Sequence, residues 1–357
     1  MCTVTYNIEN VGWNAYRNSL PEIEHKAENY IGRVTSEHKN SYQLYCQFGE
    51  IDASIMGRFR HHAQSKNDLP AIGDWVLFEY SSLEHNAIIK KILPRKTKFS
   101  RKKAGYKTQE QIVATNIDFV FLVAAAEDNF NLRRMERYLT LACESGAQPV
   151  IILNKIDLCP ALEDRIEKMN KLTPDVPVMS MSALSGDGVS QISDFLSPGQ
   201  TGALLGSSGA GKSTILNSLL GRETQKTMGV RSSDGTGRHT TSTRELFILP
   251  NGVLMIDTPG MRELQLWDSE DGLDQAFQDI SQLADSCKFR DCSHTNEPGC
   301  AVEGARQVGS ITEERYQSYQ KLQRELNFLS HSQNALSRKN KKKKDKNLSK
   351  AIKRFYR

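Results

Sequence analysis

The residues with the clearest chemistry form a glycine-rich turn that can hold phosphate groups. The sequence GSSGAGKS, from Gly206 to Ser213, matches the pattern GxxxxGK[ST] and lies between an expected strand, GALL, and an expected helix, STILNSLL. Glycines let successive backbone N–H groups point at a β-phosphate, and the start of the helix adds partial positive charge. We expect Lys212 to bridge the β- and γ-phosphates and Ser213 to bind magnesium. The nucleotide-binding residues expected here are Gly206, Ser207, Ser208, Gly209, Ala210, Gly211, Lys212, Ser213 and Thr214.

A second turn, Asp257-Thr258-Pro259-Gly260, follows the apolar run GVLMI. An acid at the end of a buried strand is the usual second holder of magnesium, and the N–H of Gly260 can meet the γ-phosphate. A strand-ending turn with a satisfied aspartate would explain this motif alone. Because the phosphate loop precedes it, we expect Asp257 to bind magnesium and count Gly260, with Lys212, among the catalytic groups.

The choice of base is expected to lie with Asn154, Lys155, Ile156 and Asp157, which follow the strand VIIL. A carboxylate such as Asp157 can accept hydrogen bonds from N1–H and the 2-amino group of guanine, which adenine does not offer. An acid buried in that position and left unpaired would disfavour ATP by a factor on the order of 10⁴. Ser182 and Ala183, after the strand VPVMSM, can present a backbone N–H to the guanine O6. Both segments lie at strand ends, where α/β sheets bind ligands.

The order of these motifs is reversed relative to ordinary Ras-like GTPases, in which the phosphate loop comes first. Here the residues expected to read guanine, 154–157 and 182–184, precede both the phosphate loop and Asp257. Buried apolar strands alternate with helices from Asp118 to Thr258, as in a mostly parallel sheet covered on both faces. The sequence therefore predicts a circularly permuted Ras-like α/β domain, a rearrangement that compact folds tolerate when their termini lie close together.

The position that follows the Asp257 turn departs from the common GTPase pattern. Many GTPases have a glutamine there to orient the attacking water, whereas this chain has Met261, whose thioether cannot do so. We expect slow intrinsic turnover. His239, in the sequence GRHTT, is the candidate for positioning the water, and a role in stabilising an ordered switch is the alternative. Thr240 is expected to bind magnesium, although Thr241 could serve equally.

A cluster of cysteines follows in the sequence CKFRDCSHTNEPGC. Three thiolates and one imidazole can form a closed tetrahedral zinc site, which leaves no position for a catalytic water and is therefore structural. The spacing is not that of a common zinc finger, so buried free thiols are the alternative. The expected zinc ligands are Cys287, Cys292, His294 and Cys300.

The remaining segments are expected to support these sites. Short alternating strands between Tyr30 and Leu93 indicate a small antiparallel barrel or sandwich, which could bind single-stranded nucleic acid or serve as a docking domain. The basic run from Arg95 to Lys107 is either a solvated linker or a contact for a phosphate backbone. Ser310 and Glu313 predict the start of a helix that reaches Leu329.

Composition excludes several classes of protein. The chain has 357 residues, 38% hydrophobic and 25% charged, with a net charge of +5. Residues 338–357 carry eleven Lys or Arg and one Asp, a net of +10, so the rest of the chain sums to −5. We expect this tail to be disordered until it meets a partner. No apolar run is long enough for a transmembrane helix, and the first residues do not resemble a secretory signal, so we expect a cytoplasmic protein.

The permuted order together with CKFRDCSHTNEPGC resembles the RsgA (YjeQ) family of GTPases that depend on the small ribosomal subunit. The resemblance covers essentially the whole chain, through GDWVLFE, EQIVATNID, NLRRMERYL, GRHTT and DTPGMREL. It implies an N-terminal OB-fold barrel, a permuted GTPase domain, a C-terminal zinc domain and a role in late maturation of the small subunit. The family shares the hydrophobic residue found here as Met261 and is described as stimulated by the ribosome, which implies that the partner completes the catalytic site.

The expected organisation is an N-terminal extension (1–29), an OB-fold-like barrel (30–100), a permuted GTPase domain (101–270), a zinc-binding domain with a C-terminal helix (271–337) and a basic tail (338–357). We expect a monomer that hydrolyses GTP with Mg²⁺, contains one structural Zn²⁺, binds the small subunit and its rRNA, and contacts no membrane. One alternative is a nucleotide-regulated RNA-binding module with incidental turnover. Another is a P-loop ATPase or kinase, against which Asp157 argues.

Overall fold

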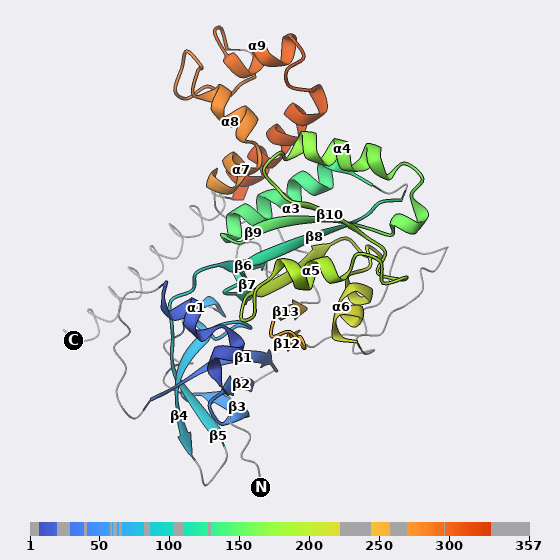
Figure 1. Cartoon of the computed structure of the whole chain (residues 1–357). Coiled ribbons are helices and arrows are strands. Elements are labelled where there is room, and N and C mark those ends of the chain that lie inside the picture. Colours follow the sequence, from blue (N-terminus) through green and yellow to red (C-terminus); the bar gives the residue numbers. More distant parts are fainter. Residues whose placement is uncertain are drawn as a thin grey trace, which may run out of the picture.

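The computed structural model describes residues 7–19, 29–38, 41–57, 59, 63, 66–81, 86–102, 110–127, 130–221, 244–257, 270–295 and 297–329. A barrel, an α/β sheet and a group of C-terminal helices follow one another along the molecule (Figure 1). The predicted residues His239, Thr240, Gly260 and Met261 lie outside the described residues, as does the basic tail. No helix in the described ranges has the length and apolar character needed to cross a membrane.

The N-terminal unit is a closed barrel rather than a sandwich. Its strands pair in the order β1-β2-β3-β5-β4, and β4 pairs back onto β1, which closes the sheet. All pairs are antiparallel except β3 with β5. Side chains on alternate positions fill the interior, including Val34, Leu44 and Phe78, which have no exposed surface. The five strands are β1 (Tyr30–Glu37), β2 (Tyr42–Cys46), β3 (Gly49–Ile55), β4 (Trp75–Ser81) and β5 (Asn86–Ile92).

The central unit confirms the predicted parallel sheet. Its strand order is β10-β9-β8-β11-β13-β12, and only β12 runs antiparallel to its neighbour within this unit. The strand that leads into the phosphate loop, β11, therefore lies at the centre. The strands are β8 (Phe119–Ala125), β9 (Gln148–Asn154), β10 (Val178–Met181), β11 (Thr201–Gly206), β12 (Arg244–Ile248) and β13 (Leu254–Asp257).

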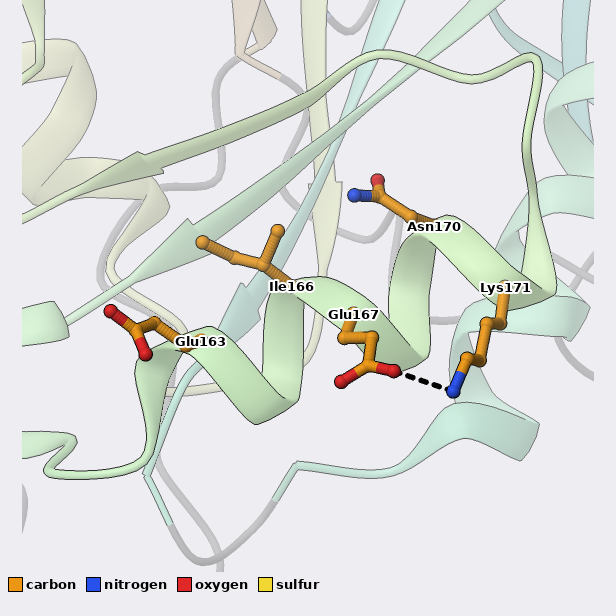
Figure 2. Close-up of a pocket in the computed structure, with 5 residues that line it drawn as sticks. All are labelled: Glu163, Ile166, Glu167, Asn170 and Lys171. Atoms are coloured by element: carbon orange, nitrogen blue, oxygen red, sulfur yellow. Dashed lines mark ion pairs between the residues drawn. The ribbon is translucent and has the colours of Figure 1, made fainter.

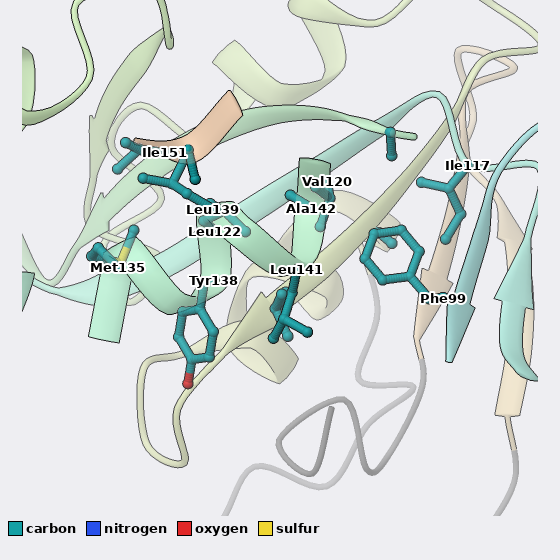
Figure 3. Packing of buried hydrophobic residues seen from close by; sticks show 14 of the residues in the cluster. Phe99, Ile117, Val120, Leu122, Met135, Tyr138, Leu139, Leu141, Ala142 and Ile151 are labelled. Carbon is teal, nitrogen blue, oxygen red and sulfur yellow. The ribbon is translucent and has the colours of Figure 1, made fainter. Parts of the chain in front are cut away.

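Helices cover both faces of this sheet because successive strand residues point to opposite sides. Leu122 of β8 packs in one core with Met135 and Leu139, whereas the next residue, Val123, packs in another with Ile215. Figure 3 shows the first core, in which the helix α3 lies along β8 and β9. The helices of the first face are α3 (Leu132–Ser145) and α4 (Leu162–Leu172), and those of the second are α5 (Ser190–Phe195) and α6 (Lys212–Leu220).

The C-terminal helices pack on α3. The guanidinium of Arg137 donates to both carboxylate oxygens of Glu325, at 2.7 and 2.8 Å. Arg315 donates to the buried carboxylate of Glu136 at 3.0 Å and to Asp279 at 2.7 Å, so one buried cation joins α3 to the C-terminal unit. This unit contains α7 (Glu270–Ala276), α8 (Gln278–Ala284), α9 (Ala301–Gln307) and a helix over residues 313–329. The last helix is capped by the hydroxyl of Thr312 rather than by Ser310.

Residues before the barrel join it to the α/β sheet, a role that the sequence did not predict. In the segment η1 (Ile8–Val11) and α1 (Trp13–Arg17), the ring of Trp13 lies 4.9 Å from that of Trp75 in the barrel. Arg33 of β1 is buried and donates to the carbonyl of Val11 at 2.6 Å and to the hydroxyl of Thr201 in β11 at 2.8 Å. The edge of β1 also pairs with β12. The barrel and the α/β unit are therefore held together by a shared sheet and a buried arginine.

The basic run is partly structural, unlike the linker or phosphate contact expected from the sequence. Arg95 forms an ion pair with the buried Asp74 at 2.6 Å. Lys98 begins a hairpin of two strands, β6 (Lys98–Lys102) and β7 (Glu110–Thr115), so the expected domain boundary after residue 100 falls inside β6. Arg95 stabilises the barrel through its ion pair with Asp74. It is unsuited to binding a phosphate backbone, because moving its side chain would leave the carboxylate of Asp74 buried and unpaired.

Candidate functional site

The phosphate loop turns between the end of β11 and the start of α6. Gly209 and Gly211 have φ angles of 77° and 98°, a conformation that favours glycine because it lacks a Cβ. A Cβ on Gly211 would lie 2.1 Å from the side-chain nitrogen of Asn154, which is too close for any residue other than glycine unless Asn154 moves. The ammonium of Lys212 donates to the carbonyls of Gly206 and Ser207, at 2.7 and 2.8 Å, so its side chain folds back onto the first residues of the loop. Local backbone geometry thus explains the glycine spacing found in the sequence.

Asn154 brings the phosphate loop and the expected base-binding residues together. Its side-chain nitrogen donates to the carbonyl of Ala210 at 2.8 Å, and its side-chain oxygen accepts from the N–H of Ala183 at 3.0 Å. Asn154 is buried, so both of its polar atoms are satisfied by the two loops that it joins. Three segments in reversed chain order therefore meet at the carboxyl ends of β9, β10 and β11.

The residues around Asn154 differ in exposure. Ser182 and Ala183 are buried, whereas Asp157 is exposed on the short helix η3 (Ile156–Leu158). The predicted selection of guanine by Asp157 assumed a buried acid, and this role stays a prediction. An exposed carboxylate costs little when unpaired, so its contribution to base selection is smaller than that of a buried one.

Lys155 completes this side of the site. Its backbone has a φ of 64° and a ψ of 41°, and its ammonium lies 2.6 Å from a carboxylate oxygen of Glu127. Glu127 belongs to none of the motifs recognised in the sequence. The sequence feature that could have indicated this residue is its position, two residues after the strand FVFLVAA and next to the strand that ends at Asn154.

Asp257 ends β13, the strand beside β11. Burial raises the pKa of Asp257, while the ammonium of Lys212 opposes this shift and the carboxylate of Glu245 adds to it. A carboxylate whose ionised form is disfavoured in this way suits a divalent cation, whose charge would favour ionisation. Ser213, in the first turn of α6, offers the hydroxyl expected as a second oxygen ligand.

The four predicted zinc ligands form a compact group in the C-terminal unit. Their ligand atoms all lie within 4.8 Å of one another. Nδ1 of His294 lies 3.6 Å from the sulfur of Cys287 and 3.5 Å from that of Cys300, and these sulfurs are 3.9 Å apart. A tetrahedral zinc ion with bonds of about 2.3 Å to sulfur and about 2.0 Å to nitrogen requires separations of roughly 3.5–3.8 Å. Three of the four ligands therefore already have separations that suit zinc, and the sulfur of Cys292 lies within 4.8 Å of each of them.

Neighbouring groups orient these ligands. The sulfur of Cys300 accepts from the N–H of Glu303 at 3.3 Å as the N-cap of α9, which fixes the position of this sulfur. The hydroxyl of Tyr316 donates to the carbonyl of His294, whose backbone has a φ of 58°. The carboxylate of Glu297 accepts from the N–H groups of Ser293 and Thr295. Such supporting contacts hold a metal site in shape, and their residue types gave no signal in the sequence.

Two hollows lie away from the nucleotide site. One of about 420 Å³ is lined only by residues of α4, among them Glu167 and Lys171, which form an exposed ion pair at 2.6 Å (Figure 2). The other, of about 600 Å³, lies between α3, the end of α4 and the C-terminal unit. The first is a helix surface that encloses nothing, and neither contains a residue of the phosphate loop.

Two protein-family models match parts of the chain that include the phosphate loop. A family model described as RsgA GTPase matches residues 92–267. A model described as ABC transporter matches residues 189–355, a range that contains the phosphate loop, which ATPases share, but lacks Asn154 and Asp157.

Named relatives match over most of the chain. The small ribosomal subunit biogenesis GTPase RsgA of Opitutus terrae is 46% identical over 309 residues, 84% of each chain. That of Methanosarcina acetivorans is 44% identical over 325 residues, 91% of this chain and 87% of the relative.

Solved structures agree with the fold. YjeQ from Thermotoga maritima has a TM-score of 0.64 and 26% identity, covering 84% of this chain and 98% of its own. YloQ, described as a circularly permuted GTPase, has a TM-score of 0.61 and 24% identity, covering 86% and 98%.

Proposed function

Because the chain belongs to the RsgA GTPase family, we propose that it hydrolyses GTP to GDP and phosphate as a switch during maturation of the small ribosomal subunit. The observation that carries this proposal is the pair of hydrogen bonds through which Asn154 joins the phosphate loop to Ala183. A pocket built on that contact can read a base at one end and bind phosphates at the other. We further propose that it binds the rRNA of the small subunit, and that it acts as a monomer in the cytoplasm.

Each expected residue has a role in this pocket. Backbone N–H groups of the loop from Gly206 to Thr214 would bind the phosphates, and Lys212 would neutralise charge that develops on the γ-phosphate. The N–H of Gly260 would contact the same group. At the base, Asp157 would accept from N1–H and the 2-amino group, and Ala183 would donate to O6. The residues assigned to the base end are Asn154, Lys155, Ile156, Asp157, Ser182 and Ala183.

Magnesium fits the oxygen donors of Ser213 and Asp257, together with Thr240. When bound, the ion would neutralise charge on the β- and γ-phosphates. The hydroxyl of Ser213 lies in the first turn of α6, and Asp257 approaches from the adjacent strand. These two residues would therefore hold the ion next to the phosphate loop.

The C-terminal cluster is proposed to bind one structural Zn²⁺ through Cys287, Cys292, His294 and Cys300. All four positions of a tetrahedral ion would be filled by protein, which leaves none for water. The ion would therefore stabilise the C-terminal unit and take no part in hydrolysis.

Phosphate release from GTP, measured with purified small subunits, with large subunits and with neither, tests the proposed switch. We expect slow release alone and strong stimulation by small subunits only, because Met261 cannot orient the attacking water and a partner must complete the site. Equal rates in the three reactions would instead favour an RNA-binding module with incidental turnover. Competition of ATP against GTP would expose an ATPase.

Substitution His239→Ala tests the proposed catalytic histidine. We expect nucleotide affinity to stay nearly unchanged, while turnover stimulated by small subunits falls by a factor of about 10² or more, the usual contribution of a group that positions or deprotonates water. Affinity for GDP and a GTP analogue, measured beside stimulated phosphate release, separates the two effects. Unchanged stimulated turnover would remove His239 from the mechanism and leave it a role in the switch.

A further inference from the structure

The ammonium of Lys155 is held by a carboxylate that no motif marks. Nζ of Lys155 lies 2.6 Å from Oε1 of Glu127, and the two side chains are 22% and 32% exposed. Glu127 follows β8 and Lys155 follows β9, and these strands are parallel neighbours. The N–H of Ala126 donates to the carbonyl of Asn154 at 2.8 Å, which fixes the two strand ends side by side. The ion pair therefore lies at the sheet edge that also carries the phosphate loop.

The backbone at Lys155 is constrained as well. Its φ of 64° belongs to the left-handed region, which is unfavourable for a residue with a Cβ. Among the described residues other than glycine, it shares a positive φ only with Asn116 and His294. Surrounding contacts must maintain such a conformation. At Lys155 these are the bonds of Asn154 to two loops on one side and the ion pair with Glu127 on the other.

We propose that Glu127 is a positioning residue for the guanine nucleotide, which acts by fixing Lys155 so that the aliphatic part of that side chain forms a wall of the base slot. This inference rests on the proposed function. A free lysine samples many rotamers, and ordering it on binding costs affinity. Pairing with Glu127 removes that freedom before the nucleotide arrives. The carboxylate also neutralises the ammonium, so Lys155 contributes packing at the base end while Lys212 provides charge at the phosphate end.

This role predicts a specific kinetic signature. The base does not change during hydrolysis, so a contact that orders its wall stabilises the ground state and the transition state equally. Loss of Glu127 should therefore raise the KM for GTP and weaken GDP binding by the same factor, with kcat unchanged. A residue required only for folding would instead reduce the amount of active protein and lower kcat.

Substitution Glu127→Gln in the full chain tests the inference, because it keeps the size of the side chain and removes its charge. We expect the Kd for GDP and for a GTP analogue to rise about fivefold, the size suited to a partly exposed ion pair. The matched control is Asp164→Asn, which breaks the 2.7 Å ion pair with Lys168 on the outer face of α4 and should leave both constants unchanged. Thermal unfolding of each variant monitors the fold.

A double-mutant cycle shows whether Glu127 acts through Lys155. In the Lys155→Met background, Glu127→Gln should cause no further loss of affinity. The inference is overturned if Glu127→Gln alone leaves nucleotide affinity unchanged, or if it weakens binding as much in that background as it does when Lys155 is present. If the unmodified protein itself fails to bind GDP and GTP, the proposed function is overturned, so the two failures are distinguishable.

Discussion

Replacing Cys292 with serine is expected to abolish zinc binding and to unfold much of the C-terminal unit. A serine hydroxyl is a poor ligand for zinc, and three remaining ligands leave an open position. The segment between Cys287 and Cys300 has few buried apolar side chains, so metal binding supplies much of its folding free energy, typically about 10 kcal/mol or more in small zinc sites. Metal analysis should find about one zinc per chain in the unmodified protein and close to none in the variant.

The position of the cluster determines how far this damage extends. Tyr316 donates to the carbonyl of His294, and Arg315 is its neighbour on the same helix. Loss of the ion should therefore reduce hydrogen-exchange protection first in residues 287–307 and then in the helix over 313–329. The parallel sheet has apolar cores on both of its faces, so nucleotide binding should decline less than C-terminal protection.

A matched control for this variant is Cys159→Ser, since Cys159 is half-buried but lies outside the cluster. It should retain zinc and full protection. Freshly prepared protein without stoichiometric metal would contradict the assignment, as would a Cys292→Ser variant that keeps its zinc. In either case the four side chains would be buried thiols and an imidazole that pack together without an ion.

Local constraints explain which features of this protein can be predicted from its sequence. The spacing of Gly209, Gly211 and Lys212 is dictated by backbone conformation within one loop, so the motif carries its geometry with it. The apolar strands and the amphipathic helix α3 were equally readable, because alternate strand residues and one helix face must be buried. A common pocket could be predicted although the base-binding residues precede the phosphate loop in the chain, since the carboxyl ends of parallel strands meet at one edge of the sheet.

The features that sequence analysis missed depend on contacts between distant segments. Arg33 reads as an ordinary strand residue, yet it joins Val11 to Thr201 across the junction of two units. The ion pair between Arg95 and the buried Asp74 could not be predicted either, because a run of basic residues does not show which acidic side chain each of them contacts. Glu127 falls in the same class, since only the register of β8 against β9 brings it to Lys155.

Replacing Asp157 with asparagine is expected to exchange guanine for xanthine as the preferred base. Asparagine presents one acceptor and one NH₂ donor, so it cannot accept from both N1–H and the 2-amino group of guanine. Xanthine has a carbonyl in place of that amino group and can accept from the new donor. A hydrogen bond to a charged group contributes about 1.5–3 kcal/mol, so the loss of two could approach a factor of 10⁴. Because Asp157 is exposed, we expect the lower end, about 10² in the Kd for GTP.

Competition among GTP, ATP and xanthosine triphosphate for the variant measures this exchange. A suitable control is Glu163→Gln, which removes an exposed carboxylate from α4 and should leave base preference unchanged. The exchange is informative because a misfolded pocket would lose all three nucleotides together, whereas an altered hydrogen-bond pattern must raise affinity for xanthosine triphosphate as it lowers affinity for GTP. If the variant binds GTP as the unmodified protein does, the base is read elsewhere, and the pocket joined by Asn154 holds phosphates without selecting guanine through Asp157.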